Sequence, residues 1–156
     1  MMNGIPKIIE TLNALLSDEL TAVNQYIVHS EMCSNWGYEK LHKADEKRAI
    51  DEMKHAEKLI SRILFLEGIP VVSHLKKISI GSEVAAQHKN DMNAEIETIA
   101  MYNNGIKFAS EVGDGGTREL LESILKDEEG HLDWLEAQMN QISQMGIQNY
   151  LADQPG

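Results

Sequence analysis

The stretch EGIPVVSHLKKISIG, residues 67–81, separates two long segments of helical periodicity and carries no helical pattern of its own. It begins with a helix stop signal, Glu67 to Pro70. Extended at roughly 3.3 Å per residue, the stretch covers about 50 Å, the length of a long helix. A structureless link this long is unusual in a compact domain unless it crosses from one end of a helix bundle to the other. The helices before and after it would then run parallel. Its apolar residues are expected along the outside of the bundle: Val71, Val72, Leu75, Ile78 and Ile80.

Four long helices are expected around this link. The expected segments are Pro6–Trp36, Glu39–Leu66, Ser82–Glu111 and Thr117–Met145, with a short C-terminal helix at Ile147–Ala152. Gly37 and Gly146 suit helix C-termini, and Thr117 suits an N-cap. The other junctions are short, so those neighbours should run antiparallel. The pattern predicts a single all-α domain over residues 1–156, a ferritin-like four-helix bundle with a long crossover between its second and third helices.

Composition narrows the possible functions. The chain has 25 acidic and 14 basic residues and a formal net charge of −11. This balance argues against nucleic acid and anionic membranes and favours attraction of cations, although solubility alone also explains it. The single cysteine, Cys33, excludes an intrachain disulfide and a Cys-rich metal site. Residues 1–7 lack the pattern of a secretory signal, and no stretch approaches the roughly 18 apolar residues of a membrane span. We therefore expect a soluble, cytoplasmic protein.

Each expected bundle helix carries one glutamate in the middle of its apolar stripe, when residues are set at intervals of about 100°. Two helices add a histidine one turn later, which forms a Glu-x-x-His pair. The six residues are Glu19, Glu52, His55, Glu95, Glu128 and His131. Burying four carboxylates without compensation costs on the order of several kcal/mol for each of them. These carboxylates must therefore be neutralised by protonation, by pairing with buried Lys or Arg, or by bound cations.

Two divalent cations would compensate the carboxylates directly. The cationic side chains near the stripes are Arg48 and Arg62, and each lies at an edge of its face. Four carboxylates and two imidazoles can hold two metal ions, as they do in di-iron and di-manganese carboxylate bundles. Ligation by oxygen and nitrogen without thiolate suits iron or manganese, and redox chemistry favours iron.

The expected geometry divides the ligands between two metal positions. Glu52 and Glu128 come from the histidine-bearing helices and would bridge the metals. The remaining ligands complete one metal each: Glu19 with His55, and Glu95 with His131. Tyr26, two turns after Glu19, is either a core residue or a side chain that hydrogen-bonds a bound ligand or takes part in redox chemistry. Tyr102 has the same ambiguity.

Glu-x-x-His by itself is weak evidence, because the chain contains a third copy, Glu39 to His42. This copy falls on the outer side of its helix, and we interpret it as a solvated chance pattern. The other histidines outside the two pairs have no supporting constellation and are expected to be ordinary helix or loop residues: His29, His74 and His88.

Met53 points away from the metal-binding face, although it lies next to Glu52. Further apolar residues surround it on the outer side of the same helix: Ala49, Ile50, Ile60 and Leu64. A homodimer interface would explain this stripe. A methionine at a two-fold contact could also meet its symmetry mate, so that two thioethers ligate one haem iron. The composition of this face and its position on the helical wheel, taken alone, favour a homodimer interface over haem ligation.

Over essentially its whole length the chain resembles the bacterioferritins. The resemblance is carried by LSDELTAVNQY at Leu16–Tyr26, NWG at Asn35–Gly37, DEMKHA at Asp51–Ala56, RILFLEGIP at Arg62–Pro70 and DEEGHLDWLE at Asp127–Glu136. The DEMKHA run is the most specific, because it combines metal ligands with the methionine that binds haem in this family. All six expected ligands match the family's ferroxidase ligands, and Met53 matches its haem ligand.

This resemblance implies a function. It implies a hollow shell of twenty-four subunits built from two-fold dimers, with haem b shared between two subunits. The implied activity is oxidation of Fe²⁺ to Fe³⁺ by O₂ or H₂O₂ at a di-iron centre of two irons per subunit, followed by storage of ferric mineral. A small ferredoxin would supply electrons for iron release. One departure is Lys47, where many members have a histidine that forms an inner-surface iron site with the residue matching Asp51.

Two other functions remain open. A non-storage di-metal oxidoreductase of peroxidase or catalase type would use the same ligands, although a rubrerythrin would usually add Cys-x-x-Cys pairs, and this chain has one cysteine. A haem electron carrier with a structural metal site would tolerate degraded carboxylates, whereas here the set is complete.

Overall fold

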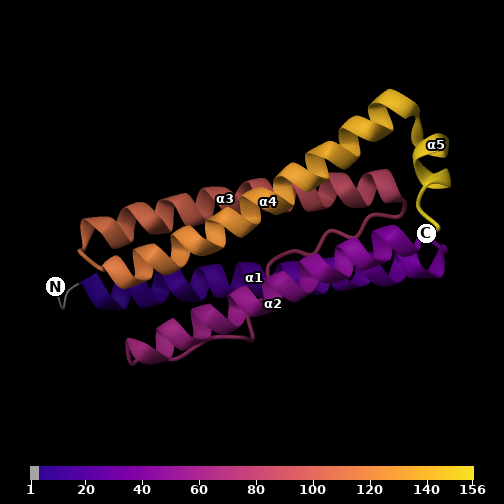
Figure 1. Ribbon diagram of the computed structural model, residues 1–156. Coiled ribbons are helices and arrows are strands. Elements are labelled where there is room, and N and C mark those ends of the chain that lie inside the picture. The colour runs from indigo at the N-terminus through magenta and orange to yellow at the C-terminus, as the bar shows by residue number, and fades with distance from the viewer. Residues whose placement is uncertain (1–3) are drawn as a thin grey trace.

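The computed structural model describes residues 4–156 and consists of four long helices and a short fifth (Figure 1). The helices are α1 (Ile5–Asn35), α2 (Glu39–Phe65), α3 (Val84–Glu111), α4 (Gly115–Met145) and α5 (Ile147–Ala152). No strand occurs in the described part of the chain. The prediction of an all-α four-helix bundle is confirmed, with residues 1–3 of the expected domain lying outside the described residues.

The helices are arranged as two antiparallel pairs. α1 packs mainly against α2, and α3 packs mainly against α4. The link between α2 and α3 returns along α1, so that α2 and α3 run in the same direction, as predicted (Figure 1). No helix in residues 4–156 is both long and apolar enough to cross a membrane.

The helix boundaries agree with the predicted ones to within about two residues, and one cap is different. α4 begins at Gly115, and its N-cap is Asp114 instead of the expected Thr117. The Asp114 carboxylate accepts the Thr117 backbone N–H at 3.0 Å and the Thr117 hydroxyl at 2.6 Å. An aspartate that takes both donors is a better cap than the threonine alone. Gly37 and Gly146 close α1 and α4 with φ of 86° and 80°, as expected of glycine.

The short α5 is fixed to the bundle through Tyr150. The Tyr150 hydroxyl donates a hydrogen bond to Gln138 at 2.6 Å and lies 3.0 Å from Nε2 of His88. His88 was expected to be an ordinary residue, but it is buried against Tyr150 and Trp134. Burial lowers the pKa of His88 to about 4, so a neutral imidazole is the form suited to this contact.

The crossover from residue 67 to residue 81 has no regular structure, yet α1 pairs with its backbone along its length. Five polar side chains, spaced four residues apart on one face of α1, form what we call the polar row: Asn13, Ser17, Thr21, Gln25 and His29. Asn13 donates to the Ile69 carbonyl at 3.1 Å and accepts the Val71 N–H at 2.8 Å. Ser17 donates to the His74 carbonyl at 2.7 Å.

The remaining members of the polar row accept backbone N–H groups of the crossover. Their donors and distances are Lys76 to Thr21 at 2.8 Å, Ser79 to Gln25 at 3.0 Å, and Gly81 to His29 at 3.0 Å. His29 was expected to be ordinary, but it is fully buried and holds the end of the link. The link is thereby ordered without secondary structure, because its polar backbone groups have side-chain partners. Its apolar side chains lie outside as predicted, with Ile78 the least exposed.

Replacing Thr21 by valine is expected to loosen the crossover. The change keeps the shape of the side chain but removes the acceptor of the Lys76 N–H, which costs about 1 kcal/mol. Hydrogen exchange followed by mass spectrometry should show faster exchange of amides in residues 71–81, with α3 and α4 unchanged. Asn24→Ala is the matched control, since Asn24 is exposed and bonds only within α1. Equal exchange in both variants would contradict a structural role of the polar row.

Candidate metal centre

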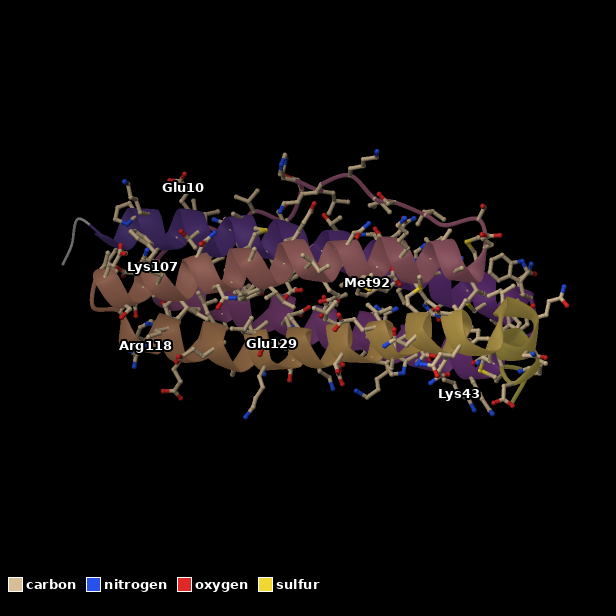
Figure 2. All side chains as sticks on the ribbon, turned by 90° about the horizontal axis from the view of Figure 1, so that it is seen from above. Glu10, Lys43, Met92, Lys107, Arg118 and Glu129 are labelled. Carbon is tan, nitrogen blue, oxygen red and sulfur yellow. The ribbon has the colours of Figure 1, made fainter. Side chains whose placement is uncertain are left out.

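The six predicted ligands converge in the middle of the bundle, one or two from each helix. Their exposed fractions are 8% for His131 and no more than 1% for the others. Two groups of four have ligand atoms within 4.8 Å of one another: Glu19, Glu52, His55 and Glu128, and Glu52, Glu95, Glu128 and His131. Glu52 and Glu128 belong to both groups, which is the arrangement expected of bridging ligands. Glu129, the neighbour of Glu128, lies near the middle of α4 and marks this level of the bundle (Figure 2).

Within each group the histidine Nδ1 faces the carboxylates. His55 Nδ1 lies 2.8 Å from Glu128, 3.2 Å from Glu52 and 3.2 Å from Glu19. His131 Nδ1 lies 3.5 Å from Glu52 and Glu95 and 3.8 Å from Glu128. Ligand atoms that share one metal ion at about 2.0–2.2 Å are separated by distances of this order.

These contacts leave polar atoms without hydrogen-bond partners. In the described part of the chain, the buried side-chain atoms without partners are Glu19 Oε1, Glu52 Oε1, His55 Nδ1, Glu95 Oε2, both oxygens of Glu128, His131 Nδ1, and Nε and Nη1 of Arg48. All but the two Arg48 atoms belong to the six predicted ligands. The short distances between these atoms therefore do not have hydrogen-bond geometry. Buried orphan acceptors are costly, and cations placed between them would satisfy all of them together.

The electrostatics of the cluster favour a cation as well. Burial raises the pKa of Glu52 and of Glu128 well above the usual range, and the neighbouring carboxylates raise it further. Burial opposes a charge on His55, but its contacts with Glu128 and Glu19 raise the pKa of His55 to about 11. Without a metal, the cluster must therefore retain protons at neutral pH. Metal ions would replace them, as they do wherever ligands must be deprotonated to bind.

Each histidine is oriented by an aspartate from the opposite helix. His55 Nε2 lies 2.9 Å from Asp127, and His131 Nε2 lies 2.9 Å from Asp51. A carboxylate on the outer nitrogen turns the inner nitrogen toward the metal positions and fixes the tautomer. The sequence analysis did not predict this role of Asp127. The repeated Asp-Glu pair before each histidine was the available signal.

Two tyrosines donate to the terminal glutamates. The Tyr26 hydroxyl donates to Glu95 at 2.6 Å, and the Tyr102 hydroxyl donates to Glu19 at 2.6 Å. Both side chains are buried. Tyr26 was expected to be either a core residue or a side chain that acts on a bound ligand; it is buried, and its hydroxyl bonds a glutamate of α3. Tyr102, given less weight from the sequence, has an equivalent contact.

Comparison with known proteins agrees with this architecture. The family model of the ferritin-like domain matches residues 9–145. The chain is 39% identical over 149 residues to a bacterioferritin of Brucella melitensis, covering 96% of this chain and 92% of that protein. It is 40% identical to a bacterioferritin of Rhodobacter capsulatus, with the same coverage. A bacterioferritin of Mycobacterium leprae is 38% identical over 151 residues, covering 97% of this chain and 95% of the relative.

The chain belongs to the bacterioferritin family. In this chain the two arginines near the site have other partners. Arg48 was predicted at an edge of the stripe, but it is 4% exposed and donates to Asp45 at 2.9 Å and Asp91 at 2.8 Å. Arg62 pairs with the α4 cap, Asp114, at 2.8 Å. Neither guanidinium is therefore paired with the buried glutamates, which leaves their compensation to protons or to bound cations.

The third Glu-x-x-His copy, Glu39 to His42, is absent from both ligand groups. Glu39 is exposed, as expected. The prediction of a solvated His42 is wrong, because its Nδ1 lies 2.9 Å from the Ser30 hydroxyl and its side chain is 16% exposed. His42 packs α2 against α1.

The outer face of α2 is apolar and exposed around Met53. Met53 is 44% exposed, and Ile50 and Leu64 are 47% and 57% exposed. The predicted stripe is corrected at two positions: Ala49 is buried against Ala22 and Tyr26, and Ile60 is half-buried against the main core. An accessible thioether with exposed aliphatic neighbours fits an apolar ring such as haem and a second subunit.

Lys47 forms an ion pair with Asp51 at 3.3 Å. The lysine therefore contacts the same aspartate that orients His131. A cation that bound the Asp51 carboxylate on this side would first have to displace the Lys47 amine.

Proposed function

We propose that this protein stores iron by oxidising Fe²⁺ to Fe³⁺ and depositing ferric mineral inside a hollow shell of twenty-four copies. The observation that carries the proposal is a buried cluster of partnerless oxygen and nitrogen atoms divided into two groups that share Glu52 and Glu128. The proposed ligands are Glu19, Glu52, His55, Glu95, Glu128 and His131. The family supports storage as the role, because its members named above are bacterioferritins.

The residues of the site have distinct roles. When bound, a pair of iron ions would supply two electrons to an oxidant, dioxygen or hydrogen peroxide. Glu52 and Glu128 hold both metal positions, and each histidine completes one. Asp127 and Asp51 keep the imidazoles turned inward through their outer nitrogens. The four glutamates are at most 1% exposed, so their contacts with metal ions would form in a low-dielectric interior that strengthens them.

We further propose that Met53 ligates haem b together with Met53 of a second copy, and that this haem receives electrons from a small ferredoxin. The support is the exposed thioether among aliphatic neighbours and the family relationship. Two methionines related by a two-fold axis provide the same donor to both faces of the ring. The proposed haem ligand Met53 lies on the exposed face of α2, whereas the proposed iron ligands Glu52 and His55 lie on its buried face.

Iron loading of the purified protein tests storage. Fe²⁺ added in increments under air should co-elute from gel filtration with a particle of the mass of twenty-four copies. The expected load exceeds two irons per subunit many-fold. Elution only as a monomer or dimer would refute the storage proposal. A shell that saturates at two irons per subunit would favour a non-storage di-metal oxidoreductase, and a shell that binds haem without iron would favour an electron carrier.

A further inference from the structure

The proposed metal ligands of α1 and α2, and their hydrogen-bond partners, recur in α3 and α4 at one constant sequence interval. Each member has a counterpart of the same type 76 positions later: Glu19 and Glu95, Tyr26 and Tyr102, Asp51 and Asp127, Glu52 and Glu128, His55 and His131. The two Gly residues that close α1 and α3, Gly37 and Gly113, keep this interval and both have positive φ. The two halves of the bundle are thus repeats of one unit.

The contacts repeat together with the residues. Each histidine meets the aspartate of the other half at 2.9 Å. Each tyrosine donates at 2.6 Å to the terminal glutamate of the other half. Each of these glutamates keeps one oxygen without a partner, Oε1 in Glu19 and Oε2 in Glu95. The hydrogen-bond pattern around the two metal positions is therefore the same.

We propose that Tyr102 is a positioning residue for Glu19, the counterpart of Tyr26 at Glu95, and that the two tyrosines make the two metal positions equivalent. The inference rests on the proposed di-metal function and adds what fixes each terminal ligand. A carboxylate with one oxygen held by a rigid donor presents its second oxygen in a defined direction. The α1 glutamate would otherwise be free to rotate within the cluster.

The surroundings of Tyr102 suit this role. Its ring is fully buried in the main core cluster with Leu15, Leu59 and Leu121, so that the hydroxyl cannot swing away. Hydrogen bonds from a neutral donor to a carboxylate are stronger than those between two neutral groups.

The equivalence is confined to the ligand contacts. The guanidinium of Arg48 lies 4.3 Å from the ring centre of Tyr26. The residue 76 positions later is Ile124, a buried core side chain. The repeat therefore places an isoleucine where a counterpart of Arg48 would face Tyr102. The two tyrosines share a positioning role, but their electrostatic environments differ.

Co²⁺ binding separates the two positions. His131→Ala weakens the Glu95 position and leaves the Glu19 position intact, and His55→Ala does the reverse. In the His131→Ala shell, adding Tyr102→Phe should weaken Co²⁺ binding about tenfold, equivalent to losing about 1.4 kcal/mol. In the His55→Ala shell the same change should alter affinity less than about twofold. Tyr26→Phe should show the opposite pattern, and Tyr150→Phe, a buried tyrosine bonded to Gln138, should show no effect in either.

The outcomes distinguish this inference from the function on which it rests. A Tyr102→Phe effect that is absent, or equal in both backgrounds, would overturn the inference while the di-metal centre stands. An unsubstituted protein that fails to bind two Co²⁺ per subunit would overturn the proposed function instead. If Tyr102→Phe does not fold, tyrosine difference absorption on adding Co²⁺ to Tyr26→Phe decides the question. A remaining perturbed tyrosine supports the role of Tyr102, and its absence refutes it.

Discussion

Replacing Glu52 or Glu128 by alanine is expected to abolish rapid Fe²⁺ oxidation, lowering its initial rate by about a hundredfold or more, or about 2.7 kcal/mol of lost stabilisation. Each of these glutamates belongs to both ligand groups, so one substitution removes a ligand from both metal positions. Glu19→Ala or Glu95→Ala removes a ligand from one position and should leave partial occupancy. Stopped-flow absorbance of the ferric product, recorded after mixing the metal-free shell with Fe²⁺ and air, measures the rate.

The matched control is Glu129→Ala. Glu129 follows Glu128 in the sequence but is exposed on the outer side of α4 (Figure 2). Its loss removes one negative charge near the site and no ligand, so its rate should match that of the unsubstituted shell. Unchanged initial rates in Glu52→Ala and Glu128→Ala would refute the proposed centre. Shell assembly, checked by gel filtration, separates loss of ligation from loss of structure.

Replacing Met53 by leucine is expected to remove the haem absorbance while the shell remains intact. Leucine keeps the volume and apolar character of the exposed α2 face but offers no sulfur to iron. Since a two-fold pair loses both thioethers at once, haem content should fall from one per two subunits to about a tenth of that or less. Reconstitution with haem, followed by visible absorbance and gel filtration, measures both quantities.

Met92→Leu is the control for this substitution. Met92 lies on α3, away from the exposed face of α2, and is half-buried (Figure 2). Its replacement should leave the haem content unchanged. Full haem occupancy in Met53→Leu would mean that another residue ligates the iron. Unchanged Fe²⁺ oxidation in the same variant would show that the outer face and the buried centre act independently in this first step.

Helical periodicity predicted much of this architecture, because a bundle helix must bury one face along its whole length. A glutamate in phase with leucines has to lie inside, wherever the partner helices are placed. Glu19 and Glu95 could thus be assigned to the interior from their own helices alone. The length of the crossover fixed the relative direction of α2 and α3 by geometry, without any information on side-chain contacts.

Contacts between helices could not be predicted in this way. A helical wheel gives the direction of a side chain relative to its own axis but does not say which neighbour it meets. Tyr26 shares a face with Glu19, yet its hydroxyl reaches Glu95 on α3. Arg48 looked peripheral on its wheel, although α3 supplies Asp91 to bury it. His42 looked solvated because the wheel of α2 does not show that α1 covers this position with Ser30.

The polar row of α1 has a consequence for the order of folding. Its contacts join residues that are 52 to 58 positions apart, so the first of them closes a long loop and each later one closes almost none. Pairing of α1 with α2 brings the start of the crossover close to Asn13. The crossover can then form its hydrogen bonds with α1 one after another, from Asn13 to His29. Once the crossover is bound along α1, the start of α3 lies at the end of the bundle from which α3 runs parallel to α2. Thr21→Val weakens a contact that forms only after Asn13 has closed the loop, so it should accelerate unfolding more than it slows folding.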